Sequence, residues 1–241
     1  MAKHGKKYLE ALKKVDEDRA YLPEEGVALL KEASWANFDE TVEVHVRLGI
    51  DPRQADQTVR STVVLPHGTG KQVRVLVFAA GEAERIALEA GADYAGSDEL
   101  VAQIQGGWLE FDASVAMADQ MGKVGGLGRI LGRRGLMPNP RSGTVVRNAE
   151  DLPDVLRELK GGRVEFRNDR TGIVHVAIGK KSFSADALRD NLYALIDAMQ
   201  RAKPSGVKGV YCRTINIAST MGPGISLDVP VTLASATSAG S

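Results

Sequence analysis

The sequence is poor in cysteine and aromatic residues, and it contains no long apolar run. Its one cysteine, Cys212, has no partner for an internal disulfide and cannot build a cysteine-based zinc site, which fits a reducing cytosol. No apolar stretch approaches the roughly 20 residues that a membrane helix needs. The basic N-terminal stretch M-A-K-H-G-K-K is not followed by the apolar segment of a secretory signal. We therefore expect a cytoplasmic protein with no membrane partner.

The sequence also has no net charge, because its 31 basic residues balance its 31 acidic residues. Bulk charge therefore does not point to a polyanionic partner. Hydrophobic residues make up 43% of the chain and charged residues 26%, which is typical of a globular protein. A chain of 241 residues can form one large domain or two of ordinary size.

The motifs of nucleotide and metal enzymes are missing as well. A Walker loop fails at Lys71, where Gln72 replaces the metal-binding hydroxyl, and again at the second G-K pair, which Val124 follows. The dinucleotide pattern fails because Leu131 stands where its last glycine belongs. Histidines occur singly, without the spacing of a metal-binding helix, and no G-x-S-x-G elbow is present. We therefore expect no enzyme activity, no metal and no cofactor.

Alternating apolar residues at the two ends of the chain predict strands with one exposed face. The clearest case is T-V-E-V-H-V-R-L-G-I, residues 41–50, and residues 58–65 are expected to form the returning strand. Residues 163–169 and 171–178 predict a hairpin, and Ser184 is expected to cap a long helix that ends at Arg201. Strands at 209–218 and 225–231 flank the tight turn S-T-M-G-P-G.

The middle of the chain follows a different pattern. The strand predicted over 72–79 is almost continuously apolar, which is typical of a strand covered on both faces. Short strands and helices then alternate: helices at 81–90, 98–105 and 152–160, and strands at 92–95 and 111–118. This order predicts right-handed crossovers and a small parallel, Rossmann-like sheet.

The two patterns predict an α/β protein of two domains, in which an α+β domain carries an inserted Rossmann-like α/β domain. We assign residues 1–67 and 160–230 to the first domain and residues 68–159 to the second. The small polar residues of 231–241 are expected to be disordered. The chain crosses between the domains twice, and we expect these residues to form a hinge: Pro66, Gly68, Gly70, Gly161 and Gly162. Opening this hinge is expected to expose the first domain's binding surface.

The stretch from Gly122 to Pro140 is rich in glycine and basic residues and contains no acid. Glycines let backbone N–H groups approach phosphate, and basic side chains supply the countercharge. A solvated flexible loop explains the same composition equally well. Candidates for a phosphate contact here are Lys123, Arg129, Arg133, Arg134 and Arg141.

Several long segments, in order along the chain, resemble the bacterial family of large-subunit ribosomal protein L-one: F-D-E-T-V-E-V-H-V-R-L-G-I-D-P-R, L-P-H-G-T-G-K-Q-V-R-V, L-G-R-I-L-G-R-R-G-L-M-P-N-P, G-R-V-E-F-R-N-D and S-T-M-G-P-G. The resemblance runs from the first residues to about Val229. It implies a monomeric two-domain protein at a mobile ribosomal stalk, bound to large-subunit ribosomal RNA. It also implies repression of its own operon through messenger RNA, and help in releasing deacylated transfer RNA from the exit site.

The resemblance implies RNA contacts in the first domain, at Phe38, Thr41, Glu43, Ser219, Thr220, Met221 and Gly222. Taken on the residues alone, a core position is favoured for Phe38, and the S-T-M-G-P-G segment can be only a hairpin turn; the resemblance favours RNA contact for both. The sequence departs from the family pattern at Asn37, often lysine in relatives, and at Arg133, usually proline. Asn37 removes one phosphate contact, whereas Arg133 adds charge to its loop.

Two other functions fit parts of the sequence. A nucleotide-binding enzyme would use the Rossmann-like insert, although every phosphate motif there fails. A structural or protein-interaction module would need no RNA surface and would tolerate loss of Thr220 and Met221. For the Gly122–Pro140 stretch, contact with transfer RNA and contact between the domains remain open alternatives.

Overall fold

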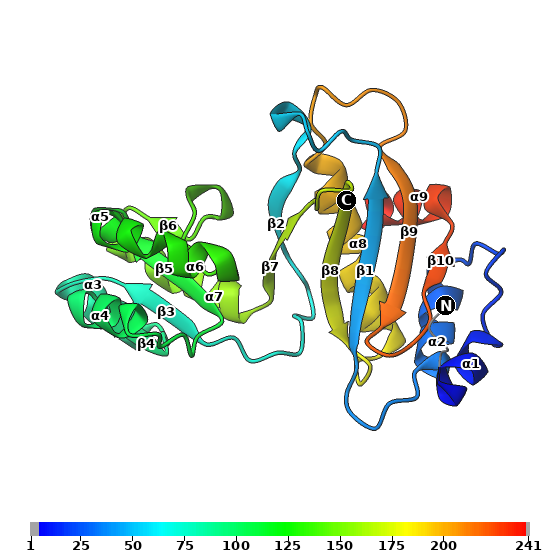
Figure 1. Cartoon of the computed structure of the whole chain (residues 1–241), viewed down its shortest axis with the longest axis horizontal. Coiled ribbons are helices and arrows are strands. Elements are labelled where there is room, and N and C mark those ends of the chain that lie inside the picture. The colour runs from blue at the N-terminus through cyan, green and yellow to red at the C-terminus, as the bar shows by residue number, and fades with distance from the viewer. Residues whose placement is uncertain (1–4, 240–241) are drawn as a thin grey trace. The chain divides into compact units, whose positions relative to one another are not determined.

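A computed structural model describes residues 5–239 of the chain. The internal contacts divide the chain into two compact units, one ending at Gly70 and resuming at Val164, the other spanning Lys71–Arg163. Helices and strands occur in both units (Figure 1). The predicted fold class, an α+β domain with an inserted α/β domain, is confirmed.

The first unit is built on a four-stranded antiparallel sheet in the order β10 (Ile225–Leu227), β9 (Cys212–Ser219), β1 (Thr41–Leu48), β8 (Ile173–Lys180). In β1, Val42, Val44, Val46 and Leu48 are buried while the residues between them are at least partly exposed. This period of two gives the sheet one apolar and one polar face.

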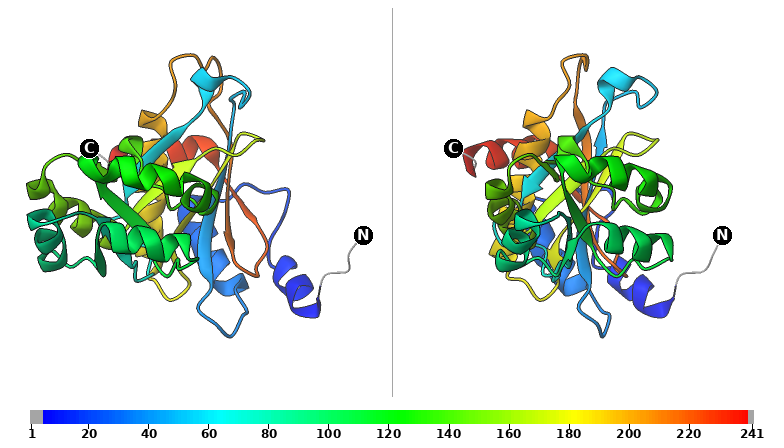
Figure 2. Two further views of the ribbon diagram at one scale, coloured as in Figure 1. Left: turned by 60° about the vertical axis from the view of Figure 1, so that its left-hand side comes forward. Right: turned by 90° about the vertical axis from the view of Figure 1, so that its left-hand side faces the viewer.

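Helices cover the apolar face. They are α2 (Pro23–Ala33), α8 (Ala185–Arg201) and α9 (Val229–Ala239). The hydroxyl of Ser184 accepts a hydrogen bond from Ala187 N at 3.1 Å, which confirms the predicted cap of α8. In Figure 2 (left), α8 and α9 lie on one side of the strands, and the short helix α1 (Lys6–Leu12) lies on the other.

Two predicted strand pairings are wrong. Strand β2 (Arg60–Val64) does not return beside β1, and β7 (Arg163–Arg167) forms no hairpin with β8. Instead β2 and β7 pair with each other in a separate two-stranded sheet, and one bridge, Asn168 to Val174, joins the β7 end to β8. Strand β2 has no place beside β1, because β8 and β9 already occupy both edges of β1.

The prediction of a disordered tail over 231–241 is wrong for residues up to 239; residues 240–241 lie outside the described range. The predicted strand 225–231 ends at Leu227, and α9 follows. The carboxylate of Asp228 accepts a hydrogen bond from Val231 N at 2.9 Å, and Pro230 suits the first helical turn. Thr232 and Ala236 are fully buried, so one face of this small-residue helix is anchored in the core.

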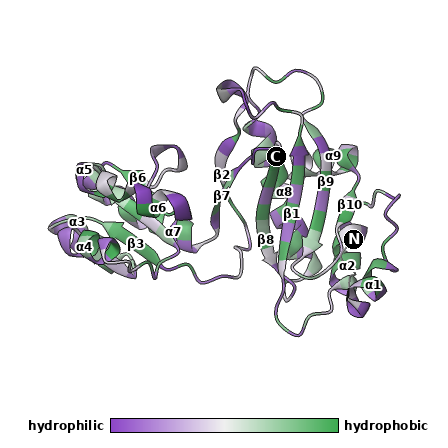
Figure 3. Ribbon diagram, in the orientation of Figure 1, coloured by the Kyte–Doolittle hydropathy of each residue, from purple (hydrophilic) through white to green (hydrophobic). Residues whose placement is uncertain are grey.

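The second unit contains a parallel sheet in the order β4 (Tyr94–Gly96), β3 (Val75–Phe78), β5 (Ala113–Met117), β6 (Val145–Val146). Strand β3 is fully buried and hydrophobic along its length (Figure 3). The helices that alternate with the strands of this unit are α3 (Glu82–Glu89), α4 (Asp98–Gln105) and α7 (Leu152–Lys160). Two apolar clusters contain alternate residues of β3, one set on each face of the sheet.

One of the two interpretations of Gly122–Pro140, a flexible loop, is wrong for residues up to Arg134, which are helical. The segment contains α5 (Met121–Val124), the 3-10 turn η3 (Gly125–Leu127) and α6 (Gly128–Arg134), which ends where Gly135 has a φ of 71°. Val124, Leu127 and Leu131 are fully buried at helical spacing and tie the segment to the core. The glycines obscured this apolar period in the sequence.

Short 3-10 turns complete the described part of the chain: η1 (Ala55–Gln57), η2 (Ala118–Gln120), η4 (Pro140–Ser142) and η5 (Ala149–Asp151). Within residues 5–239, no helix is both long and apolar enough to cross a membrane.

Candidate nucleic-acid interface

The start of β1 and the end of β9 bring together two of the predicted contact residues. Thr41 N donates to the Thr220 hydroxyl at 3.0 Å, and Thr220 N donates to the Thr41 carbonyl oxygen at 3.0 Å. The Thr220 hydroxyl also donates to that carbonyl oxygen at 3.3 Å. Residues 179 positions apart in the sequence thereby form one small surface at the end of the sheet.

Glu40, which our sequence analysis did not identify, connects the segment before β1 with the turn after β9 through buried hydrogen bonds. Its side chain is fully buried, and its carboxylate accepts hydrogen bonds from Met221 N at 3.0 Å and from Ala36 N at 2.8 Å. Burial acts to raise the pKa of Glu40, but the Ser219 hydroxyl and these two N–H groups outweigh it, and the pKa is lowered. The one signal in the sequence is an acid at the last position before the alternating strand.

Two large apolar side chains of this surface face solvent. Phe38 is 54% exposed and Met221 is 45% exposed. Phe38 therefore does not belong to the core, the alternative that the residues alone left open. Met221 lines an open hollow of about 470 Å³ with Trp35 and residues of α1, and the ammonium of Lys7 lies 5.4 Å from the Trp35 ring centre.

Polar groups complete the surface around these two side chains. The ammonium of Lys180 donates to the Thr41 hydroxyl at 2.8 Å, and Ser182 bonds to the Asp39 carboxylate through its N–H at 3.0 Å and its hydroxyl at 2.8 Å. Glu43 lies on the partly exposed face of β1, opposite Ala177 and Ala218. Sequence reasoning missed Lys180, which only the pairing of β8 with β1 brings beside Thr41.

The turn at 219–222 requires a glycine. A Cβ placed on Gly222 would collide with the Ser219 hydroxyl, which is itself buried. The close approach arises because Gly222 N donates to the Ser219 carbonyl oxygen at 3.1 Å and folds the chain back. The backbone around Gly222 is left without a side chain at the surface.

The basic residues predicted in the second unit fall into two groups. Lys123 is already paired with Asp98 at 2.8 Å and also donates to the Ser97 hydroxyl at 3.1 Å. The other group consists of exposed arginines that form no ion pair within the part of the chain that the structure describes. They lie on α6 and η4: Arg129, Arg133, Arg134 and Arg141. These four can meet phosphate at lower cost than Lys123, because no ion pair has to break first.

The predicted hinge residues differ in their backbone conformation and in how far hydrogen bonds anchor them. Gly68, Gly70 and Gly162 have positive φ angles of 65°, 72° and 107°. The first crossing is nevertheless anchored to α8, because buried Asn191 accepts from His67 N at 3.0 Å and donates to the Gly68 carbonyl oxygen at 2.9 Å. A hinge in this crossing therefore stays a prediction, and it would have to lie after Gly68.

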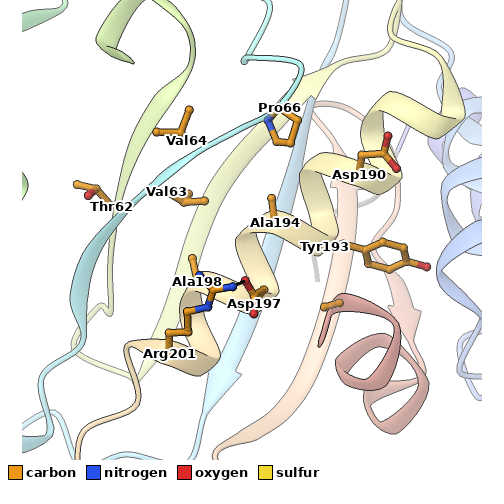
Figure 4. A pocket seen from close by; sticks show the side chains of 11 residues that line it. Thr62, Val63, Val64, Pro66, Asp190, Tyr193, Ala194, Asp197, Ala198 and Arg201 are labelled. Carbon is orange, nitrogen blue, oxygen red and sulfur yellow. Dashed lines mark ion pairs between the residues drawn. The ribbon is translucent and has the colours of Figure 1, made fainter. Parts of the chain in front are cut away.

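A separate groove of about 560 Å³ lies between β2 and α8 and contains none of the predicted RNA contacts (Figure 4). Its charged groups already have partners. Asp197 pairs with Arg201 at 2.5 Å, and Asp190 lies 3.1 Å from the imidazole of His67. The groove therefore presents little unpaired charge to a polyanion.

Sequence comparison identifies the family of this two-unit fold. The profile of the Ribosomal protein L1p/L10e family matches residues 30–223, which include both segments of the surface at Thr41 and Thr220. The chain therefore belongs to this family of ribosomal proteins. The family favours the ribosomal interpretation over a nucleotide-binding enzyme on the second unit.

Individual relatives agree over nearly the whole chain. Large ribosomal subunit protein uL1 of Thermomicrobium roseum is 67% identical over 233 residues, 97% of each chain. The protein of the same name from Chloroflexus aggregans is 63% identical over 230 residues, 95% of this chain and 97% of the relative. That of Dehalococcoides mccartyi is 54% identical over 229 residues, 95% of this chain and 96% of the relative.

Proposed function

We propose that this protein is a constituent of the large ribosomal subunit and binds large-subunit ribosomal RNA through the surface at Thr41 and Thr220. The observation that carries the proposal is a rigid edge of the sheet that leaves Phe38 and Met221 exposed. Large apolar side chains stay exposed in such a fixed setting where a partner covers them. Membership of a ribosomal protein family makes RNA that partner.

Each group of the surface has a role that suits RNA. The hydroxyls of Thr41 and Thr220 reach ribose 2′-OH groups or phosphates, and Lys180 places a positive charge beside them. Phe38 and Met221 pack against a sugar or base, as apolar and aromatic residues do in recognition of unpaired RNA. Glu43 accepts a hydrogen bond from a 2′-OH or a base amino group rather than contacting phosphate.

The proposal includes two further roles, one for this surface and one for the second unit. A messenger RNA that mimics the ribosomal site would occupy it in place of ribosomal RNA, so the protein would repress its own operon. The arginines of α6 and η4 would contact exit-site transfer RNA when the second unit moves about the crossings at Gly70 and Gly162. The protein would be a monomer when it is off the ribosome, and it would function on the ribosome in the cytoplasm.

The test is an electrophoretic mobility shift with a stalk fragment of large-subunit ribosomal RNA over a salt series. Met221→Ala and Thr220→Ala are compared with Val210→Ala, because Val210 is another exposed apolar residue of the same unit, 71% exposed. We expect Met221→Ala to weaken binding about tenfold, because one base or sugar loses its packing partner. Val210→Ala should bind as the wild type does.

Poor binding by the wild-type protein would refute the proposal, and so would equal binding by the Met221 and Val210 variants. Thr220→Ala also loses two hydrogen bonds within the protein. Its melting temperature is therefore measured alongside, so that a loss of affinity is not confused with unfolding.

A further inference from the structure

A second groove, of about 840 Å³, lies at the end of the first unit's sheet that is opposite to the Thr41–Thr220 surface. It is formed by the turn between β7 and β8 together with the start of β2. Its walls contain several charged and polar side chains: Thr58, Arg60, Glu165, Arg167, Asp169, Arg170 and His175. None of these residues belongs to the surface described above.

The acids of this groove are committed to partners inside the protein. Glu165 pairs with Arg60 at 2.5 Å. The carboxylate of Asp169 accepts hydrogen bonds from Ile173 N, from Thr171 N and from the Thr171 hydroxyl, each at 2.8 Å. The Ile173 N–H and the Thr171 groups lower the pKa of Asp169 to about 2, so this acid is ionised and is stabilised by donors of its own turn.

The arginines at 167 and 170 are in the opposite situation. Both are exposed, and neither forms an ion pair with another residue of the described range 5–239. The backbone between them is anchored, since Asn168 N donates to the Val59 carbonyl oxygen at 3.1 Å and the Asn168 side-chain oxygen accepts from Val59 N at 2.8 Å. Arg170 occupies a turn that Gly172 N closes by donating to the Asp169 carbonyl oxygen at 3.3 Å.

We propose that this groove is a second RNA-binding site, in which Arg167 and Arg170 hold phosphates of the RNA that occupies the Thr41–Thr220 surface. Guanidinium groups bind phosphate through two parallel N–H bonds, and the hydrogen-bonded turn spares the cost of ordering the backbone that carries them. The proposal rests on the proposed function. It adds a contact about 20 Å away, because Arg47, which lies opposite Ile173 beside this groove, is six strand residues from Thr41.

The open face of the sheet makes a continuous polar path between the two sites. Along β1 the partly exposed side chains are Glu43, His45 and Arg47, and His45 Nδ1 lies 2.8 Å from Nδ1 of His175. Arg47 is exposed and brings a further positive charge next to the groove. An RNA lying along this face would meet polar groups at every step.

The experiment measures binding of the full-length protein to the stalk RNA fragment from 0.05 to 0.3 M salt. The test variant is Arg167→Ala/Arg170→Ala. The control, Arg157→Ala/Arg201→Ala, removes the same charge from two exposed arginines that form ion pairs elsewhere. Melting temperatures of all proteins confirm that the first unit is folded. The variant Arg167→Lys/Arg170→Lys keeps both positive charges but lacks the two parallel N–H donors of each guanidinium, so it separates the effect of charge from that of hydrogen-bond geometry.

We expect the test variant to bind about tenfold more weakly at low salt, with a log–log salt slope shallower by about 1.4–1.8, because two phosphate contacts are lost. The lysine variant should keep the slope and lose only part of the affinity. The proposal is overturned if the test variant and the control agree within twofold in affinity and have equal slopes. If the wild type does not bind this RNA, the proposed function fails and this site fails with it.

Discussion

Substitution of Glu40 by glutamine separates preorganisation of the RNA surface from direct contact with RNA. Glu40 is fully buried and cannot touch a ligand, yet its carboxylate receives the N–H groups of both Ala36 and Met221. A glutamine side chain has one acceptor oxygen, so its NH2 group would face the second N–H donor. The variant therefore loses one charge-assisted hydrogen bond, and its buried NH2 group faces a backbone N–H group, so that two donors meet without an acceptor.

The cost follows from these two losses. One charge-assisted hydrogen bond contributes about 1.5–3 kcal/mol, and an unsatisfied buried donor costs about 1–3 kcal/mol. We expect the free energy of unfolding to fall by about 3 kcal/mol, which a domain stable by about 5–15 kcal/mol survives. Binding RNA must then re-order the Ser219–Gly222 turn, for which we expect about 2 kcal/mol, or roughly 30-fold in Kd.

The assay combines urea unfolding with RNA binding at 25 °C, so that affinity is referred to folded protein only. The control is Glu32→Gln, an exposed acid whose side chain is 68% exposed and pairs with Lys14 on the surface. It should change stability and affinity by less than about 0.5 kcal/mol. Because the pKa of Glu40 is lowered, its stabilisation is present above its ordinary pKa of 4.5 and is lost as the pH falls further. Unchanged RNA affinity in Glu40→Gln, once corrected for unfolding, would refute the reasoning.

Three further predictions follow. Gly222→Ala should lower RNA affinity about tenfold with little change in unfolding of the second unit, because its Cβ would displace Ser219; a mobility shift beside a melting curve checks this. Asn191→Leu should destabilise the first unit by about 3 kcal/mol in urea unfolding, since two N–H···O bonds to carbonyls and one accepted bond are lost in a buried place. Burial and the neighbouring imidazole lower the pKa of His45, so the unfolded state binds more protons just below pH 6.5 and stability decreases as the pH falls. Between pH 7 and 5.5, the melting temperature of His45→Asn should therefore fall less than that of the wild type.

The sequence predicts the elements of this protein best where one local signal decides them. The helices Asp98–Gln105 and Leu152–Lys160 were predicted at the residues where they occur, because glycine follows each of them and their apolar residues have a helical period. The alternating pattern also predicts β1 and the face that it buries. Periodicity does not say which strand lies beside another, and β2 was therefore assigned to the wrong neighbour.

The errors at α6 and α9 have one physical cause. Both helices contain residues whose own preferences do not favour a helix: glycines in the first, serines and threonines in the second. Tertiary packing decides them, through Leu131 in one case and Ala236 in the other. In the candidate RNA surface, the residues that resemble a family motif could be found from sequence, whereas Glu40 and Lys180 could not, because their roles depend on strand pairing.

The central place of β1 between β8 and β9 sets a condition on synthesis of the protein. The second unit is one continuous segment, so it can fold as soon as it leaves the ribosome that makes it. The first unit cannot, because β1 has no sheet neighbour in the preceding chain and must wait for residues 173–219. The hydrogen bonds between Thr41 and Thr220 can form only after residue 220 has also been synthesised. A nascent chain therefore has no assembled RNA surface until it is nearly finished, and we expect only completed molecules to compete for RNA.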